Sequence, residues 1–349
     1  MIRVLIADDS AMMRRILRKM LEADSDIEVI ATARDGNDVV EKARELTPDV
    51  ITMDVNMPGQ DGITALQYII NDKICPVIMV SSLTQEGAVT TFEALELGAF
   101  DFIGKPDGTV SSNMESIATE LLAKVKAAAG MKKGRKALQR WTRANRRPAV
   151  KPGAISSGKI MKVVAMGISA GGPKVIYEVL PLLPPDINAA IFMVQHMPPN
   201  FTATYAKRLN DFCQVKVVEA KAGMKVEAGV VYIASGGRHL NVAKTSSGEV
   251  LLRLPTKPDH LYIPSVSVMM RSVLKIYGRC TIGVIMTGMG NDGADAMVDI
   301  HRAGGITIAE SEESAIVFGM PNEAIKRGGA EIIVPIWDIA HEIIKAVNR

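Results

Sequence analysis

Short apolar runs alternate with amphipathic segments from the start of the chain to about residue 106. Segments 11–23, 37–47 and 89–98 carry apolar residues at helical spacing, and a closing helical pattern follows at 114–127. The runs with strand character are RVLIA (3–7), IEVIATA (27–33), DVITMD (49–54), PVIMVS (76–81) and DFIGK (101–105). Strands that alternate with helices in this way predict a parallel, doubly wound sheet.

A second alternating pattern begins near residue 160 and continues to the end of the chain. Its strand-like runs are 162–167, 189–195, 215–220, 230–235, 249–254, 281–287, 305–310 and 331–336. Its helical patterns are 173–183, 203–212, 265–277, 293–304, 320–328 and 337–347. The chain is therefore expected to form two α/β domains, each with a doubly wound parallel sheet.

The stretch between the two patterns is strongly basic. From Met131 to Lys162 there are eleven Lys or Arg residues and no Asp or Glu, which leaves 30 basic against 38 acidic residues elsewhere. Such a run can bind nucleic acid or an acidic membrane, but a solvated linker is the simpler interpretation, because only Trp141 offers an aromatic platform. We expect a domain at 1–125, a basic linker at 126–159 and a second domain at 160–349.

Composition favours a cytoplasmic protein. The 349 residues are 48% hydrophobic, which is enough for two cores, and no apolar run reaches the roughly 18 residues needed to span a bilayer. The N-terminus has no secretory signal pattern. Because Cys75, Cys213 and Cys280 are far apart and match no metal-binding spacing, we expect reduced thiols.

Charged side chains gather at the predicted strand ends of the first domain. Asp8 and Asp9 end the first strand, Asp54 ends the third and Lys105 ends the fifth. The carboxyl ends of parallel strands share one edge, where crowded carboxylates repel one another unless a cation lies among them. Oxygen ligands suit Mg²⁺, while Lys105 and the hydroxyl of Ser81 can meet a phosphoryl group. A single Asp here could merely cap a helix, but the whole set predicts a phosphoryl-accepting site.

The segments VLIADDSAMMRRIL, DVITMDVNMPGQDG, VIMVSS and GKP resemble the receiver domain of two-component response regulators. The resemblance implies a flavodoxin-like fold over about 1–125, in which Asp54 accepts the phosphoryl group. It implies that Ser81 and Lys105 respond to the phosphate, and that Phe102 occupies an aromatic position that many receivers rotate on activation. The ligands that it implies for Mg²⁺ are the carboxylates of Asp8, Asp9 and Asp54 and the backbone carbonyl of Asn56.

In the second domain a serine, a histidine and an aspartate each follow a strand-like run. Ser169 lies in GISAG (167–171), which fits the G-x-S-x-G nucleophile elbow, although a Gly-rich turn before a helix binds phosphate equally well. His196 follows the next strand, and Asp292 lies in MTGMGNDG. Together the three residues predict acyl transfer by a serine nucleophile. Their order along the chain argues against an ordinary α/β-hydrolase fold, in which the aspartate precedes the histidine.

The chain has five histidines, and His239 is the main competitor of His196 for the role of general base. His239 also follows a strand-like run, whereas His260 lies in a Pro-flanked loop and His301 and His341 lie on amphipathic helices. We prefer His196 because its strand comes directly after the serine turn, and consecutive strands are commonly neighbours.

The segments GISAGG, QHMP, YIASGGRHL, SVSVMM, GVIMTGMGNDGADAM and GMPNEAI resemble the catalytic domain of chemotaxis protein-glutamate methylesterases. The resemblance implies a Rossmann-like domain over 160–349. Ser169 would be the nucleophile, His196 the general base and then acid, and Asp292 the carboxylate that orients the imidazole. The backbone N–H of Met289 would stabilise the oxyanion.

A receiver, a linker and this catalytic domain, in this order, match the same family. The implied function is phosphorylation-activated hydrolysis of glutamate methyl esters on chemoreceptors for sensory adaptation, with deamidation of glutamines as a second activity. The implied partners are the methylated cytoplasmic helices of chemoreceptors and the chemotaxis histidine kinase as phosphodonor, with no nucleic acid and no membrane insertion. Mg²⁺ is expected only at the receiver, and no cofactor at the triad. Many members have Thr where this chain has Ala170, so a hydroxyl contact beside the nucleophile is missing.

Control by the receiver is a further expectation. The unphosphorylated receiver should cover the edge that carries Ser169, and phosphorylation of Asp54 should release it, because a polar linker allows only a modest, reversible contact between domains.

Two other classes of function compete with this one. A nucleotide- or DNA-binding output domain is disfavoured because residues 160–349 contain no G-K-[ST] after a Gly-rich loop and no helix-turn-helix with basic recognition residues. A hydrolase of small-molecule esters is excluded only by the family resemblance.

Overall fold

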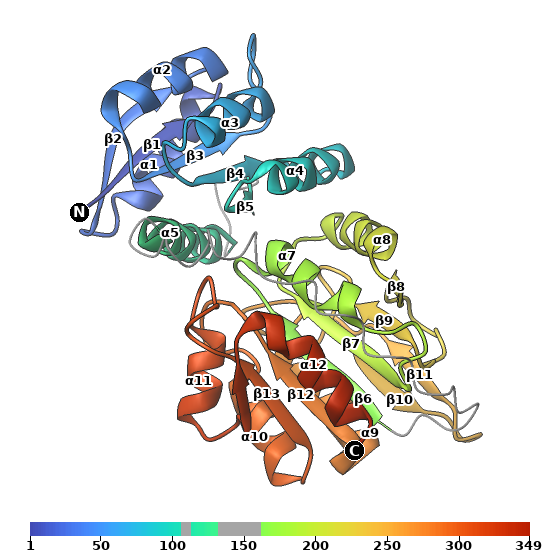
Figure 1. Cartoon of the computed structure of the whole chain (residues 1–349). Coiled ribbons are helices and arrows are strands. Elements are labelled where there is room, and N and C mark those ends of the chain that lie inside the picture. The colour runs from blue at the N-terminus through green and yellow to red at the C-terminus, as the bar shows by residue number, and fades with distance from the viewer. Residues whose placement is uncertain (106–112, 132–161) are drawn as a thin grey trace. The chain divides into compact units, whose positions relative to one another are not determined.

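The computed structural model describes residues 1–105, 113–131 and 162–349, which belong to two compact units (Figure 1). Most of the predicted basic linker, including Trp141, falls outside these residues. Across the described ranges, no helix combines the length and the apolar character needed to cross a membrane.

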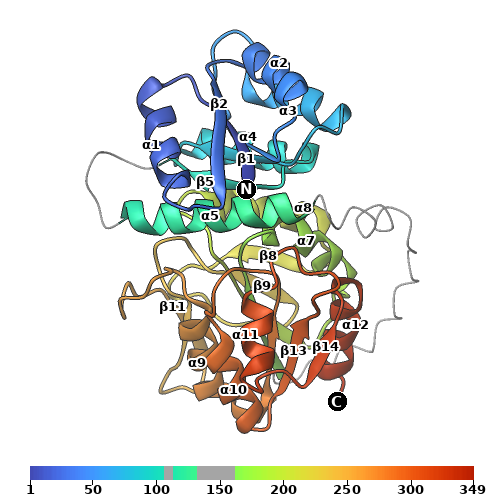
Figure 2. The same cartoon turned by 90° about the vertical axis from the view of Figure 1, so that its left-hand side faces the viewer.

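A five-stranded parallel sheet forms the centre of the first unit, in the order β2-β1-β3-β4-β5. Its strands are β1 (Ile2–Ala7), β2 (Ile27–Ala33), β3 (Val50–Asp54), β4 (Val77–Ser81) and β5 (Asp101–Gly104). Its helices are α1 (Ala11–Leu21), α2 (Gly36–Leu46), α3 (Gly62–Asn71), α4 (Gln85–Leu97) and α5 (Asn113–Met131). Helix α1 packs beside α5, and α3 packs between α2 and α4, so both faces of the sheet are covered (Figures 1 and 2). The predicted doubly wound fold is confirmed.

Helix α3 is an element that the hydrophobic pattern did not reveal. Its sequence, GITALQYIIN, is apolar at most positions, and Thr64, Gln67 and Asn71 supply only a short polar stripe. The structure nevertheless buries one side of it, and the carboxylate of Asp61 starts it by accepting the N–H of Thr64 at 2.7 Å.

A seven-stranded parallel sheet forms the centre of the second unit, in the order β14-β13-β12-β6-β7-β9-β8. Its strands are β6 (Lys162–Ile168), β7 (Ala189–Gln195), β8 (Lys216–Glu219), β9 (Val230–Ile233), β12 (Thr281–Ile285), β13 (Ile306–Glu310) and β14 (Ile332–Val334). Its helices are α7 (Gly172–Val175), α8 (Phe201–Phe212), α9 (Val266–Tyr277), α10 (Ala294–Arg302), α11 (Met320–Lys326) and α12 (Ile336–Val347). Helices α9, α10 and α11 cover one face of the sheet, and α7, α8 and α12 cover the other (Figures 1 and 2).

Two elements of the second unit differ from the sequence-based expectation. The helix expected at 173–183 is only the single turn α7, followed by two short 3₁₀ turns at Ile176–Glu178 and Leu180–Leu182. Pro181 prevents a regular α-helix from continuing to residue 183, because its ring clashes with the carbonyl of Tyr177, but α7 has already ended at Val175. The strand expected at 249–254 forms β11 (Val250–Arg253), but it pairs antiparallel with β10 (Asn241–Lys244) in a separate hairpin.

The strand order explains where ligands can bind. In the second unit the chain proceeds outward from β6 to one side and then from β12 to the other, so the order reverses between these two adjacent strands. In the first unit the same reversal lies between β1 and β3. The crevice at the carboxyl ends of strands that flank such a reversal is the usual ligand site of open α/β sheets. Both groups of candidate residues lie at these two places.

Candidate active site and acidic cluster

Ser169 directly follows β6, in the turn that leads into α7. Its backbone N–H donates to the carbonyl of Thr287 at 2.9 Å, and its carbonyl accepts from the Gln195 side chain at 3.0 Å. Gly171 has a φ of 76°, in the left-handed region that glycine tolerates best, which allows the chain to turn sharply here. A Cβ at Gly288 would lie 2.8 Å from the Cβ of Ser169, so only glycine lets these two turns approach each other.

His196 lies between the other two predicted residues of the triad. It follows β7, and its backbone N–H donates to the carbonyl of Ile168, which holds the ends of β6 and β7 together. Its Nδ1 is 3.0 Å from the Oγ of Ser169, and its Nε2 is 2.9 Å from the Oδ2 of Asp292. Because a carboxylate only accepts, Nε2 carries the proton and Nδ1 is free to accept the serine proton. The two nitrogens therefore exchange the roles that they have in the chymotrypsin-type triad.

Asp292 is a buried carboxylate that caps the first turn of α9. Its Oδ1 accepts from the hydroxyl of Ser265 at 3.0 Å and from the N–H of Ser267 at 2.9 Å, and its Oδ2 accepts from the N–H of Val266 at 2.7 Å. Burial alone would raise the pKa of Asp292, but the hydrogen bonds from His196 and Ser267 and the charge of the imidazole lower it overall. The carboxylate is thus kept ionised beside the imidazole that it orients.

His239, the competing candidate, has a different position. It is fully buried, its Nε2 donates to the carbonyl of Pro258 at 2.9 Å, and its Nδ1 accepts the N–H of Ser265 at 3.2 Å. Both ring nitrogens are therefore engaged with the backbone of the loop that leads into α9. The geometry favours His196 as the base.

Two backbone N–H groups lie beside Ser169. Met289 lies in the turn after β12, and Ala170 is the residue after the serine, a common position for an oxyanion donor. Neither N–H is paired with an acceptor within the described parts of the chain. The sequence pointed to Met289 alone, but the G-x-S-x-G pattern could also have indicated Ala170.

A buried polar network holds the turn that carries Ser169, and nothing in the sequence pattern predicted it. The hydroxyl of Thr287 donates to the carbonyl of Ala170 at 2.9 Å, and its N–H donates to Glu310 at 2.8 Å. Ser314 donates to the second oxygen of Glu310, also at 2.8 Å. Burial raises the pKa of Glu310 to about 7 despite these two hydrogen bonds.

We expect Glu310→Gln to remove part of the pH dependence of stability. Between pH 4.5, the ordinary pKa of this carboxyl, and about 7, the folded chain keeps a proton that the unfolded chain releases. The wild-type free energy of unfolding should therefore fall as pH rises through this window, by on the order of 2–3 kcal/mol. The variant mimics the protonated form and should lack this decrease. Urea titrations at pH 5 and pH 8 measure it, with the exposed neighbour Glu313→Gln as control.

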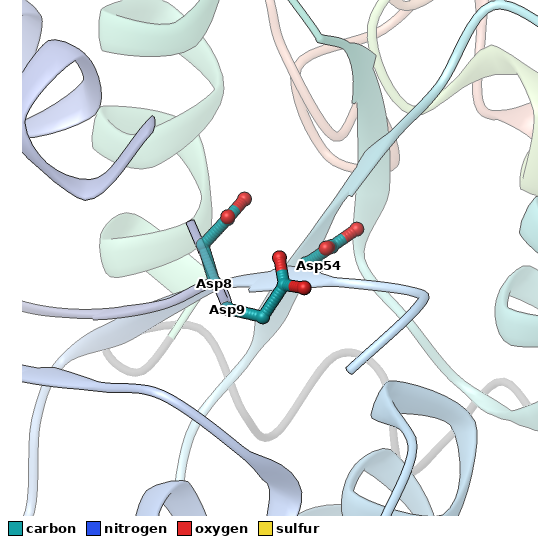
Figure 3. A group of neighbouring side chains, drawn as sticks. All are labelled: Asp8, Asp9 and Asp54. Atoms are coloured by element: carbon teal, nitrogen blue, oxygen red, sulfur yellow. The ribbon is translucent and has the colours of Figure 1, made fainter. Parts of the chain in front are cut away.

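Three carboxylates meet at the carboxyl ends of β1 and β3 in the first unit (Figure 3). One oxygen from each of Asp8, Asp9 and Asp54 lies within 4.8 Å of the others. The ammonium of Lys105 is 2.7 Å from Asp54 and 3.0 Å from Asp8. Burial raises the pKa of Asp54, and the charge of Asp8 adds to this, so that Lys105 and the N–H of Asn56 offset the increase only in part. The pKa of Lys105 is raised because its two carboxylate partners outweigh the effect of burial.

This cluster fits Mg²⁺. Hard carboxylate oxygens that converge from two strand ends are the ligands that this ion prefers, and the cluster carries more negative charge than one ammonium can balance. The structure thus brings together Asp8, Asp9, Asp54 and Lys105. Asn56 lies beside them, with its N–H 3.3 Å from Oδ1 of Asp54.

The other two predicted switch residues lie on the neighbouring strands. Ser81 ends β4, is buried, and donates its hydroxyl to the carbonyl of Gly87 at the start of α4, at 3.2 Å. Phe102 on β5 is also buried and packs edge-to-face on Phe92 of α4, with ring centroids 6.2 Å apart. Both side chains therefore contact α4, which makes this helix the element that they can influence.

Comparison with known proteins finds a matching family for each of the two units. A family model described as CheB methylesterase matches residues 164–343, and one described as response regulator receiver domain matches residues 4–115. Protein-glutamate methylesterase/protein-glutamine glutaminase 3 of Syntrophomonas wolfei is 68% identical over the full length of both chains. The protein of the same name, without the number, from Pyrococcus horikoshii is 42% identical over 99% of this chain and 94% of its own.

A solved structure resembles the second unit. The crystal structure of the Thermotoga maritima CheB methylesterase catalytic domain is 38% identical, with a TM-score of 0.51, and covers 53% of this chain and 97% of that domain. Fold, site and comparisons together define a response regulator whose output domain is a hydrolase. The chain belongs to the protein-glutamate methylesterase/protein-glutamine glutaminase family.

Proposed function

We propose that this protein hydrolyses glutamate methyl esters on the cytoplasmic helices of chemoreceptors and deamidates glutamines there, under control of its receiver. The observation that carries the proposal is the position of His196, within hydrogen-bond distance of both Ser169 Oγ and Asp292 Oδ2. The names of the relatives suggest the substrate class, and the geometry of Ser169, His196 and Asp292 supports their roles as nucleophile, base and orienting carboxylate. We propose domain boundaries at 1–125, 126–159 and 160–349, and a cytoplasmic location on the sequence grounds given above.

The chemistry follows from the two hydrogen bonds of His196. As Ser169 Oγ attacks the ester carbonyl, its proton passes to Nδ1, and Asp292 stabilises the imidazolium that forms. The N–H groups of Met289 and Ala170 are the proposed donors to the oxyanion. The imidazolium then protonates the leaving methoxy oxygen, and methanol departs from the acyl-enzyme. Water, activated by Nδ1, attacks the acyl carbon, which releases glutamate and restores Ser169.

In the first unit, Asp54 is the proposed phosphoryl acceptor, with the chemotaxis histidine kinase as donor. Asp8, Asp9, Asp54 and the carbonyl of Asn56 would hold Mg²⁺, which would supply positive charge for the phosphoryl oxygens. Phosphorylation adds about −1.5 to −2 charge at the end of β3. Lys105 and Ser81 can exchange their present partners for the phosphoryl oxygens. Phe102 packs against α4, the same helix that Ser81 contacts.

Methanol release from methylated receptor membranes tests the proposed function. The proposed enzyme releases methanol as receptor glutamates appear, whereas a nucleotide- or DNA-binding output domain releases none. An esterase for small molecules would cleave a small aryl ester but leave the receptor methylated. The last two outcomes would each contradict the proposal.

Removal of residues 1–130 should raise basal esterase activity. If the unphosphorylated receiver inhibits with a coupling free energy of about 1–3 kcal/mol, the increase should be about 5- to 150-fold. The response to Mg²⁺ plus a small phosphodonor should vanish with the receiver. In the full chain, Asp54→Asn should also abolish this response, whereas exposed Asp72→Asn should keep it. An isolated catalytic domain that is no more active than the unphosphorylated chain would refute inhibition by occlusion.

A further inference from the structure

Tyr262 lies flat against the imidazole of His196. The ring centroids are 4.3 Å apart and the ring planes differ by 11°, which is a stacked arrangement. Tyr262 comes from the loop between β11 and α9, not from a strand end, and takes no part in the proton transfers described above. One face of the proposed general base is therefore covered by a side chain with no assigned role.

The loop that carries Tyr262 is tied to the triad carboxylate. The N–H of Tyr262 donates to Nδ1 of His260 at 3.2 Å. The Nε2 of the same histidine is 3.5 Å from the hydroxyl of Ser265 and 3.9 Å from Oδ1 of Asp292. The tyrosine ring and the carboxylate thus hold His196 from two directions, and His260 links the two.

The hydroxyl end of Tyr262 reaches a second part of the site. A Cβ at Gly290 would lie 3.7 Å from the phenolic oxygen, which places this oxygen at the 288–290 turn. That turn contains Met289, a proposed oxyanion donor. One side chain therefore spans the distance between the proposed base and the proposed oxyanion site.

We propose that Tyr262 is a positioning residue, whose ring face fixes the plane of the His196 imidazole so that Nδ1 points at Ser169 while Nε2 points at Asp292. The proposal deepens the proposed function and rests on it. The hydrogen bonds of Nδ1 and Nε2 leave the imidazole able to tilt about the line that joins Ser169 Oγ and Asp292 Oδ2. A flat ring stacked on one face opposes that tilt. An aromatic face also favours the imidazolium that forms when the serine proton is transferred.

Kinetics of three variants in the full-length protein test the proposal. Tyr262→Phe keeps the ring face and should retain kcat within about 3-fold, whereas Tyr262→Leu and Tyr262→Ala should lose about 10- to 100-fold in kcat. KM should change by less than about 3-fold in all three, because a residue that positions the base acts on proton transfer and not on substrate binding. Leu261→Ala is the matched control: this neighbour in the same loop is 70% exposed, and its loss should leave kcat unchanged within about 2-fold.

A spectroscopic measurement separates positioning from a general structural effect. In protein with ¹⁵N-labelled histidine, the Nε2 proton that His196 shares with Asp292 should give a low-field resonance that is absent from Asp292→Asn. Wild type, Tyr262→Phe and Leu261→Ala should keep this resonance. Tyr262→Leu and Tyr262→Ala should lose it to exchange with water, while the far-ultraviolet circular dichroism stays unchanged.

Several results would overturn the proposal. A Tyr262→Leu protein that keeps both kcat and the resonance would show that the ring face is dispensable. Equal losses in Tyr262→Phe and Tyr262→Leu would assign the effect to the hydroxyl instead. If Tyr262→Ala does not fold, the comparison of Tyr262→Phe with Tyr262→Leu still tests whether the ring face positions His196. A wild-type protein that releases no methanol would refute the proposed function. Because the resonance is measured without substrate, it would still test the positioning role of Tyr262.

Discussion

Ser169→Ala should lower kcat for methanol release by about 10⁴ or more while the protein stays folded. The substitution removes one oxygen, which is 3.0 Å from Nδ1 of His196, and leaves the backbone contacts of the turn in place. The proposed oxyanion donors remain, so a residual rate above that of uncatalysed hydrolysis is expected. Methanol release from methylated receptor membranes, with circular dichroism of the same samples, measures both parts of the prediction.

Ser247→Ala is the matched control, because this serine lies in the exposed turn between β10 and β11, where its hydroxyl is 2.8 Å from that of Thr245. It should leave kcat unchanged. Near-normal methanol release from Ser169→Ala would rule out a serine nucleophile at this position.

Asp292→Asn should lower kcat by about 10³- to 10⁴-fold, less than His196→Ala, while KM changes little. Asp292 accepts from three groups at the start of α9 and from Nε2 of His196. If the amide nitrogen of Asn takes the position of Oδ2, it faces Nε2, which must then lose its proton. The proton moves to Nδ1, and the imidazole can no longer accept from Ser169.

The other orientation of the Asn side chain directs its NH₂ group at the N–H of Ser267, so the first turn of α9 loses a cap in either case. Thermal unfolding should therefore occur at a lower temperature than in wild type. Asp295→Asn, a change at an exposed residue of α10 whose partner is Arg327, should alter neither kcat nor this temperature appreciably. Equal activity of Asp292→Asn and wild type would show that Asp292 serves only as a cap for α9.

The sequence predicted the parts of the site that depend on sheet topology. Ser169, His196 and Asp292 each follow a strand-like run, and residues at adjacent strand ends of a parallel sheet must lie close together. The same rule predicted the cluster of Asp8, Asp9 and Asp54. Periodicity and strand-end position were sufficient because they specify which edge of the sheet a side chain occupies.

The contributions of loops could not be predicted in this way. Tyr262 lies in an irregular segment between β11 and α9, where no period of the sequence indicates which way a side chain points. Glu310 looked like the polar end of a strand, and only the folded chain shows that it is fully buried and accepts a hydrogen bond from Thr287, next to the turn of Ser169. The helix after Ser169 ends at Val175, well before Pro181, so the proline in the sequence could not show where the helix stops.

Because Asp292 both caps α9 and accepts from His196, a local opening of α9 would also change the orientation of the imidazole. When the first turn of α9 opens, the carboxylate loses the N–H groups of Val266 and Ser267, and the imidazole loses its fixed partner at the same moment. Such openings occur far more often than global unfolding, and amide hydrogen exchange reports their free energy residue by residue. The exchange rates of these two amides should therefore report the fraction of molecules whose base is misplaced, before any loss of overall structure can be detected.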